Sequence, residues 1–378
     1  MSNSQEFETV SALEAAEFAP TQFVRWFREV APYMREVRGK TFVVAFGGEL
    51  IEASKLNNLV IDLSLLSALG VQLVVVYGSH PQVNQQLTLK GIDKQLQRGV
   101  IEPTPADVLE CCKEMAGEIR LDIEAAFSQG LPNTPMSNSQ IHIISGNFVT
   151  AQPVGIVDGV DYKHTGKVRK FDLDSIRKAL SLNAIVLLSP IGFSPTGEAF
   201  NLAMEELATS VAGALKADKL LFVTQDNRVR DAEGVLITEL AREEAEKLVT
   251  AQTLDPQTQS YLKWANEAVR LGVKRAHLIP FEIDGSLLLE YFTHDGVGTM
   301  VVEDSLDRLR PATVDDIGAI ISLIQPLEAD GTLVPRERGE IERDVEKFTV
   351  LEHDSVIYGS LPLSRRADGR DGLPHCPS

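Results

Sequence analysis

Apolar residues along the chain fall into short continuous runs, separated by segments in which they recur at helical spacing. Six runs have the length and apolar character of buried strands and are expected to form strands at 42–46, 72–77, 141–145, 185–189, 219–224 and 276–280. The segments between several of them are expected to form helices at 57–69, 105–127, 203–216 and 260–271. This alternation predicts an α/β fold whose mainly parallel sheet is covered by helices on both faces.

The segment 20–38 has the pattern of an amphipathic helix, whereas residues 1–19 are polar and expected to be loose. The apolar stripe of this helix is rich in aromatic side chains and consists of Phe23, Trp26, Phe27, Val30, Tyr33, Met34 and Val37. Two interpretations remain open. The helix packs on its own domain, or it packs against the same helix of a neighbouring copy and builds an oligomer.

Glycines follow the first two expected strands. Gly47 and Gly48 end the run TFVVAFGG, and Gly78 ends the run VQLVVVYG. A glycine turn between a strand and a helix lets backbone N–H groups approach an anion, and the helix N-terminus favours negative charge. The pair of turns therefore predicts a site for a small molecule that carries a carboxylate or a phosphate.

A second, smaller unit is expected at 304–359, with the order strand–helix–helix–strand–strand. Thr313 is the expected N-cap of its first helix, and acidic residues follow in the first turn. About 50 residues are too few to bury a core comfortably alone. The tail 360–378 has three prolines, two glycines and three arginines without apolar periodicity, so we expect it to be unstructured.

Charge and composition exclude several classes of partner. The net charge of −18 argues against nucleic acid and against an anionic membrane surface. The chain has no apolar run of about 18 residues and no signal-like start, so we expect a cytoplasmic protein outside the membrane. The three cysteines cannot form a disulfide framework, and Cys111 and Cys112 are expected to be small core residues. We expect no metal.

Specific stretches add a family resemblance: FVVAFGGELI, LVVVYGSHPQV, ISGNFVTAQPVGIVDGVDYKHTGKVRK, SPTGEAFNLAMEELA and GVKRAHLIPFEIDGSLLLEYFTHDGVGTM. They resemble the amino-acid-kinase fold of acetylglutamate kinases and of the N-terminal domain of bacterial N-acetylglutamate synthases. The stretch RPATVDDIGAIISLIQPLEADGTLVPR resembles the first half of the acetyltransferase (GNAT) domain of those synthases. The resemblance implies a three-layer, amino-acid-kinase-like α/β sandwich at 39–303 and an incomplete GNAT α/β domain at 304–359.

The resemblance also implies a kinase-like pocket. Gly47, Gly48 and Gly78 match the turns that cradle phosphate in kinases. Arg98 matches the arginine that holds the substrate carboxylate, and Asn201 matches the asparagine that contacts the substrate.

The chain departs from the kinase pattern at charged positions. Ala45 stands where kinases have a lysine in the first strand, and Glu205 stands in place of an aspartate. Tyr261 stands at a second lysine position, although nearby Lys263 leaves that alignment open. Phosphoryl transfer depends on cations that stabilise the transferred charge, so losing them should abolish it. The resembled synthases share this loss.

The stretch from His277 to Met300 resembles the arginine-feedback signature of arginine-sensitive kinases and synthases. His277, Glu290 and Gly296 match residues that hold effector L-arginine there, and Tyr33 matches a tyrosine from the N-terminal helix. A carboxylate suits a guanidinium, and a Gly-x-Gly turn offers backbone groups. A simpler interpretation remains open, in which Glu290 is a solvated charge. The resemblance also implies that the helix at 20–38 joins dimers into a hexamer.

The resembled synthases transfer an acetyl group from acetyl-CoA to L-glutamate in the first step of arginine biosynthesis. The CoA-binding motif of such domains, Arg/Gln-x-x-Gly-x-Gly/Ala, does not occur after residue 308. We therefore expect this chain to lack acetyltransferase activity, and its catalytic residues stay unassigned. Arg310 is a candidate contact of the glutamate carboxylate, and the alternative that it is a solvated arginine stays open and is the more common case for such a residue.

The last sixteen residues suggest a change of reading frame. A permitted back-translation of 363–378, read after dropping its first base, gives YPEEQMAEMACLTVHP, which resembles the synthase strand expected at this point. We expect a frame change near codon 360, which the gene sequence would test. Two alternatives to a synthase remain open, namely a non-catalytic arginine-binding module and an acetylglutamate kinase.

Overall fold

The computed structural model describes residues 20–94, 96, 101–129, 141–293, 296–305, 307–334, 337–353 and 356–362. The chain divides into two compact units, Met1–Glu303 and Asp304–Ser378. Each unit has its own sheet and its own hydrophobic core.

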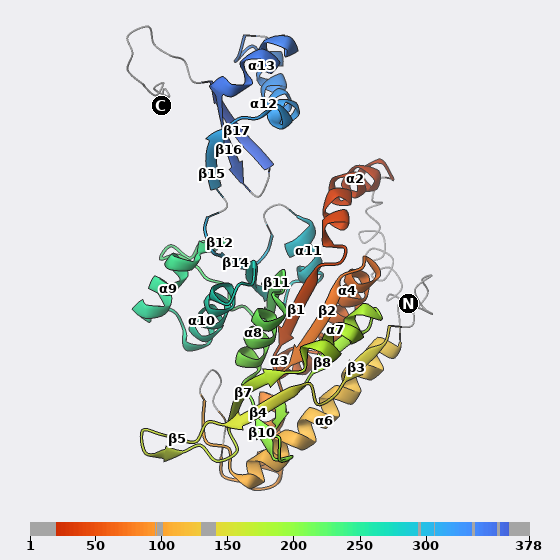
Figure 1. The fold of residues 1–378 in the computed structure, drawn as a ribbon, viewed down its shortest axis with the longest axis vertical. Helices are drawn as coiled ribbons and strands as arrows, with labels where there is room; N and C mark the ends of the chain where they lie inside the picture. Colours follow the sequence, from red (N-terminus) through yellow and green to blue (C-terminus); the bar gives the residue numbers. More distant parts are fainter. Residues whose placement is uncertain are drawn as a thin grey trace, which may run out of the picture. The chain divides into compact units, whose positions relative to one another are not determined.

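An eight-stranded sheet runs through the first unit in the order β12-β14-β13-β11-β1-β2-β8-β3 (Figure 1). The six strands from β13 to β3 are parallel, and β14 runs antiparallel to β13. The bounds are β1 Thr41–Phe46, β2 Gln72–Tyr77, β3 Ile143–Ser145, β8 Ile185–Leu188, β11 Lys219–Thr224, β12 Glu239–Ala241, β13 Arg275–Pro280 and β14 Thr299–Val302.

Helices cover both faces of this sheet, so the first unit has three layers. One face carries α7, α8, α9 and α10, and the other carries α2, α4, α6 and α11. The bounds are α2 Pro20–Val37, α3 Gly48–Glu52, α4 Leu56–Ala68, α5 His80–Leu89, α6 Ala106–Ser128, α7 Leu173–Ser181, α8 Met204–Leu215, α9 Arg242–Ala251, α10 Pro256–Arg270 and α11 Ser286–Phe292.

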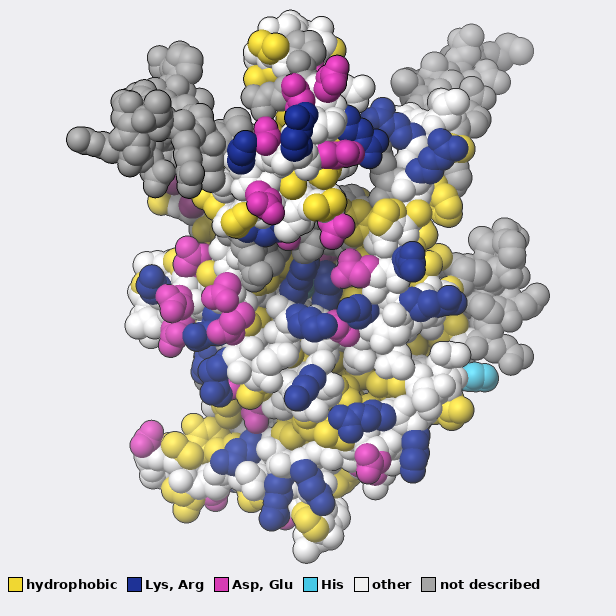
Figure 2. All heavy atoms as spheres, turned by 45° about the horizontal axis from the view of Figure 1, so that its top comes forward, with side chains coloured by type: hydrophobic (Ala, Val, Ile, Leu, Met, Phe, Trp, Pro, Cys, Tyr) yellow, Lys and Arg dark blue, Asp and Glu magenta, His cyan; other side chains and the backbone are white. Residues whose placement is uncertain are grey.

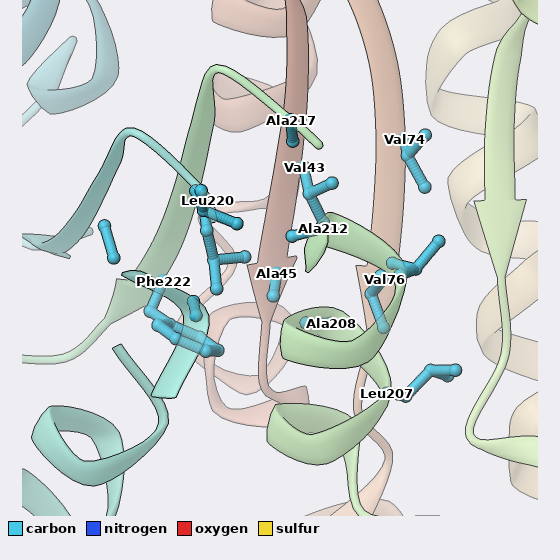
Figure 3. Close-up of a cluster of buried hydrophobic side chains, with 14 of the residues drawn as sticks. Val43, Ala45, Val74, Val76, Leu207, Ala208, Ala212, Ala217, Leu220 and Phe222 are labelled. Carbon is cyan, nitrogen blue, oxygen red and sulfur yellow. The ribbon is translucent and has the colours of Figure 1, made fainter. Parts of the chain in front are cut away.

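The central strands are apolar on both faces because both faces are buried. In β1, Val43 and Ala45 face the α8 side, whereas Phe42, Val44 and Phe46 belong to the opposite core. Figure 3 shows α8 lying across the central strands, with its small alanine side chains near Ala45. Small residues at this contact let the helix approach the sheet closely.

A second sheet and a hairpin extend the first unit beside the central strands. The order of the four-stranded sheet is β10-β9-β4-β7, and β5 pairs with β6. The bounds are β4 Val149–Pro153, β5 Ile156–Val157, β6 Val160–Asp161, β7 Gly166–Phe171, β9 Ile191–Phe193 and β10 Ala199–Asn201.

The N-terminal helix α2 divides its apolar stripe between two surroundings. Val30 and Val37 are buried in the core of the first unit, and Tyr33 and Met34 pack against that core. Nearer the beginning of the helix, Trp26 is 44 % exposed and Phe27 is 48 % exposed. The second half of α2 therefore packs on its own domain, as one interpretation of the sequence held, and the first half keeps an exposed aromatic face.

The second unit is a three-stranded antiparallel sheet, β15-β16-β17, with helices packed on it. Asp316 accepts hydrogen bonds from the Thr313 backbone N–H at 2.7 Å and from its hydroxyl at 2.9 Å. Thr313 thus precedes the short 3-10 turn η1, and the α-helix that follows begins at Ile317, four residues after the expected cap. The bounds are β15 Asp307–Pro311, η1 Val314–Asp316, α12 Ile317–Ala329, α13 Arg338–Asp344, η2 Val345–Lys347, β16 Phe348–His353 and β17 Val356–Pro362.

Two boundaries differ from the sequence expectation. β17 continues three residues into the tail expected to be unstructured, because the main chain of Ser360–Pro362 pairs with Phe348–Val350. α10 begins four residues earlier than expected, at Pro256, because the Asp255 carboxylate caps the helix. The six expected strands and the other three expected central helices are confirmed within two residues at each end.

Several expectations from composition can be compared with the structure. Cys111 and Cys112 are buried core residues on α6, as expected. Among the described residues, no helix has both the length and the apolar character required to cross a bilayer. Figure 2 shows a face on which basic and acidic side chains are interspersed.

Candidate functional site

The two glycine turns lie side by side because β1 and β2 are adjacent parallel strands. Phe46 and Tyr77 are in register, and the Gly78 N–H donates to the Phe46 carbonyl at 2.8 Å. A cavity of about 530 Å³ opens here, and we call it the glycine-turn cavity. Its lining includes four of the five residues assigned to the kinase-like pocket: Gly47, Gly48, Gly78 and Asn201. The fifth, Arg98, lies outside the described residues.

Acidic side chains are among the groups that line the cavity at the glycine turns. Glu49, Glu205 and Glu206 all line the cavity. Burial raises the pKa of the Glu205 carboxyl, and the charge of Glu49 raises it further. Burial also raises the pKa of Glu206, although a backbone N–H of Val168 and the positive charge of Lys167 oppose that effect. Burial therefore disfavours the charged form of both carboxyl groups.

Ala45 explains why the cavity lacks a kinase-type cation on β1. Its side chain is 1 % exposed and belongs to the core between the sheet and α8. In Figure 3 it lies beneath α8 among other apolar side chains. The position where kinases have a lysine is thus part of the hydrophobic core here.

A second cluster lies on the opposite side of the sheet, between β13 and α11. His277 is in the middle of β13, and Glu290 is on α11. His277 Nδ1 lies 2.6 Å from Glu290 Oε1, and the two side chains are 2 % and 6 % exposed. The simpler interpretation of Glu290 as a solvated charge is therefore wrong.

Glu290 also holds the loop that leads into β14. Its Oε2 accepts hydrogen bonds from the backbone N–H groups of Val297 and Gly298, each at 2.8 Å. Gly296 has a φ of +59°, and a Cβ atom there would lie 2.7 Å from Glu290 Oε2. Only glycine fits this turn without displacing the carboxylate. We call His277, Glu290 and the loop 296–298 the His277–Glu290 site.

Electrostatics fix the charge states at this site. Burial is the main cause that lowers the pKa of His277 to about 4, and the positive charge of Lys219 adds to it. Burial tends to raise the pKa of Glu290, but the hydrogen bonds from His277 and from the backbone outweigh it and hold that pKa below its ordinary value. Near pH 7 the carboxylate is ionised and the imidazole is neutral.

The neutral imidazole leaves one hydrogen-bonding atom without a partner. With Nδ1–H donating to Glu290, the proton assignment makes Nε2 an acceptor. Nε2 is buried and has no hydrogen-bond partner among the described residues. Buried polar atoms are rarely left unpaired, so this atom marks a place for an N–H donor.

Lys219 is a residue of this site that the sequence reasoning missed. It begins β11, and its Nζ lies 4.4 Å from the centroid of the Tyr291 ring on α11. Leu221 pairs with His277, so Lys219 lies two residues from that register position and on the same face of the sheet. The sequence could have indicated Lys219, because a lysine at the start of an expected buried strand is unusual and the next expected strand along the chain is the one that carries His277.

Tyr33 lies in the hydrophobic cluster that also contains Tyr291 and Val297, which flank Glu290 on α11 and on the loop. The helix α2 packs against α11 in this way. The structure thus brings all four residues matched to the effector signature to one side of the first unit: Tyr33, His277, Glu290 and Gly296.

Arg310 on β15 is engaged within the second unit. Its guanidinium donates to both oxygens of Asp316, at 2.6 and 2.9 Å, and Nε contacts Glu352. The two carboxylates raise the pKa of Arg310, and the guanidinium holds the pKa of Asp316 far below its ordinary value. This geometry makes Arg310 a brace between β15, β16 and the start of α12. A glutamate contact stays a prediction.

Metal ligation is a separate question. Within the described ranges, no three or more His, Cys, Asp and Glu side chains are grouped so that they could hold a metal ion.

Comparison with known proteins first defines the class. Residues 40–280 match the model of the amino acid kinase family. Carbamate kinase from Giardia lamblia, bound to AMP-PNP, has a TM-score of 0.52 at 13 % identity, over 70 % of this chain and 99 % of that chain, which shows the shared fold alone. The first unit therefore has the amino-acid-kinase fold.

The relatives then define the family. An amino-acid acetyltransferase from Ralstonia nicotianae is 55 % identical over 94 % of this chain and 79 % of the relative. One from Escherichia coli is 43 % identical over 91 % and 78 %. N-acetylglutamate synthase from Neisseria gonorrhoeae, complexed with coenzyme A and L-arginine, has a TM-score of 0.80 at 34 % identity, over 92 % of this chain and 80 % of that chain. The chain belongs to the amino-acid acetyltransferases, the N-acetylglutamate synthases.

Proposed function

We propose that this chain serves the synthesis of N-acetylglutamate, in which an acetyl group passes from acetyl-CoA to the amine of L-glutamate. Family membership supports the reaction class. The Neisseria synthase was solved with coenzyme A and L-arginine, and also with coenzyme A and N-acetyl-glutamate. Acetyl-CoA is accordingly the proposed co-substrate, and L-glutamate the acceptor.

We propose that L-arginine binds at the His277–Glu290 site and regulates the reaction as a feedback effector. The observation that carries this proposal is the unpartnered Nε2 of His277 beside an ionised, buried Glu290. An acceptor atom next to a negative charge suits a ligand with cationic N–H groups. Lys219 supplies a positive charge nearby that suits the carboxylate of the same amino acid.

Both oxygens of Glu290 are already bonded within the protein. Glu290 therefore supports arginine binding through its charge and by holding the loop 296–298 in place. This arrangement differs from a direct carboxylate–guanidinium pair, which the residue types alone favoured.

Calorimetric titration of the purified chain with L-arginine tests the proposal. We expect saturable binding that Glu290→Gln weakens, because the variant loses the charge and one acceptor. Glu282→Gln is the matched control, since Glu282 is exposed on the connection just before α11. Absence of saturable heat in the wild type, or equal loss in both variants, would contradict arginine binding at this site.

The kinase alternative has less support. Ala45 is a core residue, so β1 brings no lysine to the glycine turns, and the carboxylates of Glu49, Glu205 and Glu206 are among the groups that line the cavity there. Turnover of ATP by the purified chain would restore that alternative. An oligomer built through α2 is proposed on the exposed aromatic face of its first half. A cytoplasmic location is proposed on the two free, buried cysteines, which suit a reducing compartment.

A further inference from the structure

We propose that Arg228, in the connection between β11 and β12, is a positioning residue for the His277–Glu290 site and fixes the loop 296–298 in the form that binds the effector. This role rests on the proposed binding of L-arginine there, and it adds a residue that lies outside the effector signature. Three features support it: the contact of Arg228 with the loop, the orientation of the peptide group that it holds, and the anchoring of Arg228 itself.

Arg228 contacts the loop directly, although it lies 69 residues away in the chain. Its Nη1 donates a hydrogen bond to the Val297 carbonyl oxygen at 3.1 Å, and its side chain is 15 % exposed. The next residue makes a second contact, because the Val229 N–H donates to Thr299 Oγ1 at 2.9 Å and both residues are buried. The connection after β11 therefore packs along the loop and the first residue of β14.

The contact of Arg228 fixes the orientation of one peptide group. The Val297 carbonyl accepts from Arg228, and the N–H of the same peptide group, which belongs to Gly298, donates to Glu290 Oε2 at 2.8 Å. The carbonyl and the N–H of a trans peptide point in opposite directions, so this group lies between a guanidinium and a carboxylate. A rotated peptide group would direct its carbonyl towards the carboxylate and its N–H towards the guanidinium, and both contacts would be repulsive.

Arg228 is itself held in place from two sides. Its Nε donates to Asp226 Oδ1 at 2.6 Å, and this contact is the main cause that lowers the pKa of Asp226. Asn227, the residue between them, is 7 % exposed, and its Nδ2 donates to Thr258 Oγ1 at 3.2 Å. The backbone that carries Arg228 is thereby tied to α10, and the guanidinium is restrained next to the loop.

These contacts matter more for the ligand site than for the fold. The Asp226 side chain is 45 % exposed, and ion pairs that are open to water contribute little to the free energy of unfolding. The loop 296–298, in contrast, carries the backbone N–H groups that help to keep the Glu290 carboxylate ionised next to His277. Loss of Arg228 should therefore affect the affinity for L-arginine more than the thermal midpoint.

Calorimetric titration of the 378-residue chain with L-arginine tests this role. Arg228→Met removes the charge and the donors, so it should weaken L-arginine by about tenfold, the effect of losing one charge-assisted contact. Arg228→Lys keeps a charged donor and should recover part of the affinity. Arg230→Met is the matched control, because Arg230 contacts the same Asp226 carboxylate at 3.5 Å but donates to the Gly234 carbonyl at 3.2 Å.

Hydrogen exchange without ligand separates positioning from a general loss of stability. In Arg228→Met the amides of 297–302 should exchange faster, whereas those of β1 and β2 should exchange as in the wild type. Unchanged exchange in 297–302 would overturn the positioning role, as would a loss of protection throughout the first unit. If Arg228→Met does not fold, as judged by circular dichroism, Arg228→Gln takes its place under the same criteria.

The outcomes distinguish the role of Arg228 from the proposed function. Binding of L-arginine by the wild type with equal affinity in Arg228→Met would overturn the role of Arg228 alone. Equal weakening by Arg228→Met and Arg230→Met would also overturn it, because the effect would then come from the charge around Asp226 and not from the loop. Absence of saturable binding in the wild type would overturn the effector site and the role of Arg228 with it.

Discussion

At the scale of single residues, Asp62 shows how burial sets a pH dependence. It lies on α4 with 7 % of its surface exposed, and burial together with the nearby charge of Asp284 raises its pKa to about 7. Asn58 donates to Asp284 at 2.6 Å and keeps that charge in place. The folded state therefore holds a proton on Asp62 that the unfolded chain releases near pH 4.

Stability should consequently fall as the pH rises from about 4 to about 7, by at most about 1.4 kcal/mol per pH unit, and level off above. Asp62→Asn removes this loss, so its thermal midpoint should exceed that of the wild type at pH 8 and differ less at pH 5. Asp122→Asn, at an exposed position of α6, serves as the control. An identical pH slope in wild type and Asp62→Asn would refute the assignment.

Gly296 provides a second prediction at this scale. Its φ of +59° and the 2.7 Å approach of Glu290 Oε2 make alanine costly at this position, by about 1–3 kcal/mol. We expect Gly296→Ala to displace the carboxylate and to weaken arginine by about tenfold or more in calorimetry.

Gly91→Ala is the matched control for Gly296→Ala. Gly91 has a φ of +67°, and a Cβ atom there would have no neighbour within 4 Å. The control therefore carries the same backbone strain without the contact to Glu290. If both variants weaken arginine binding equally, the loss of affinity comes from backbone strain and not from displacement of the Glu290 carboxylate.

At the scale of elements, α2 presents Trp26 and Phe27 at 44 % and 48 % exposure. Aromatic side chains at this level of exposure on one short helix segment are typical of an interface. We expect the double substitution Trp26→Ser and Phe27→Ser to reduce the molar mass measured by light scattering. Leu182→Ser, at a leucine 71 % exposed after α7, should leave the mass unchanged. A wild type that is already monomeric would contradict the prediction.

The contacts of Arg310 with Asp316 lead to a second prediction at the element scale, which concerns the stability of the second unit. Lysine cannot reproduce the two-pronged contact with Asp316, so Arg310→Lys should destabilise the second unit by about 1–3 kcal/mol. Hydrogen exchange of the β15–β17 amides, compared with β1 and β2, would measure this change. Arg343→Lys on the exposed surface of α13 is the control. Unchanged exchange in β15–β17 would mean that the brace contributes little.

At the scale of the whole molecule, the affinity for arginine should vary with pH as His277 and Glu290 gain or lose protons. With a pKa of about 4, His277 stays neutral from pH 6 to pH 8, and Glu290 stays ionised. Arginine affinity should be flat over that range and fall as the pH drops towards 4, because protonation turns Nε2 from acceptor into donor. A steep change between pH 6 and 7 in calorimetry would instead indicate a histidine of ordinary pKa.

The alternation of apolar runs and helical segments was sufficient to place the central elements. Strands buried on both faces need apolar residues at nearly every position, so β1, β2 and β11 are legible in the sequence. The family resemblance added the residues of both sites, but not their surroundings. The hypothesis of a frame change concerns residues outside the described ones and stays a prediction, as does the expected inactivity of this chain.

The sequence by itself determined the α/β class, the glycine turns and the absence of a lysine at Ala45, because local pattern and residue identity are sufficient for these. Only the tertiary structure decided what each charge meets. It bonded both oxygens of Glu290 inside the protein, paired Arg310 with Asp316, brought Lys219 towards His277, and covered Gly47 with Glu49. These outcomes depend on strand order and register, which join residues far apart in the chain and leave no local signal.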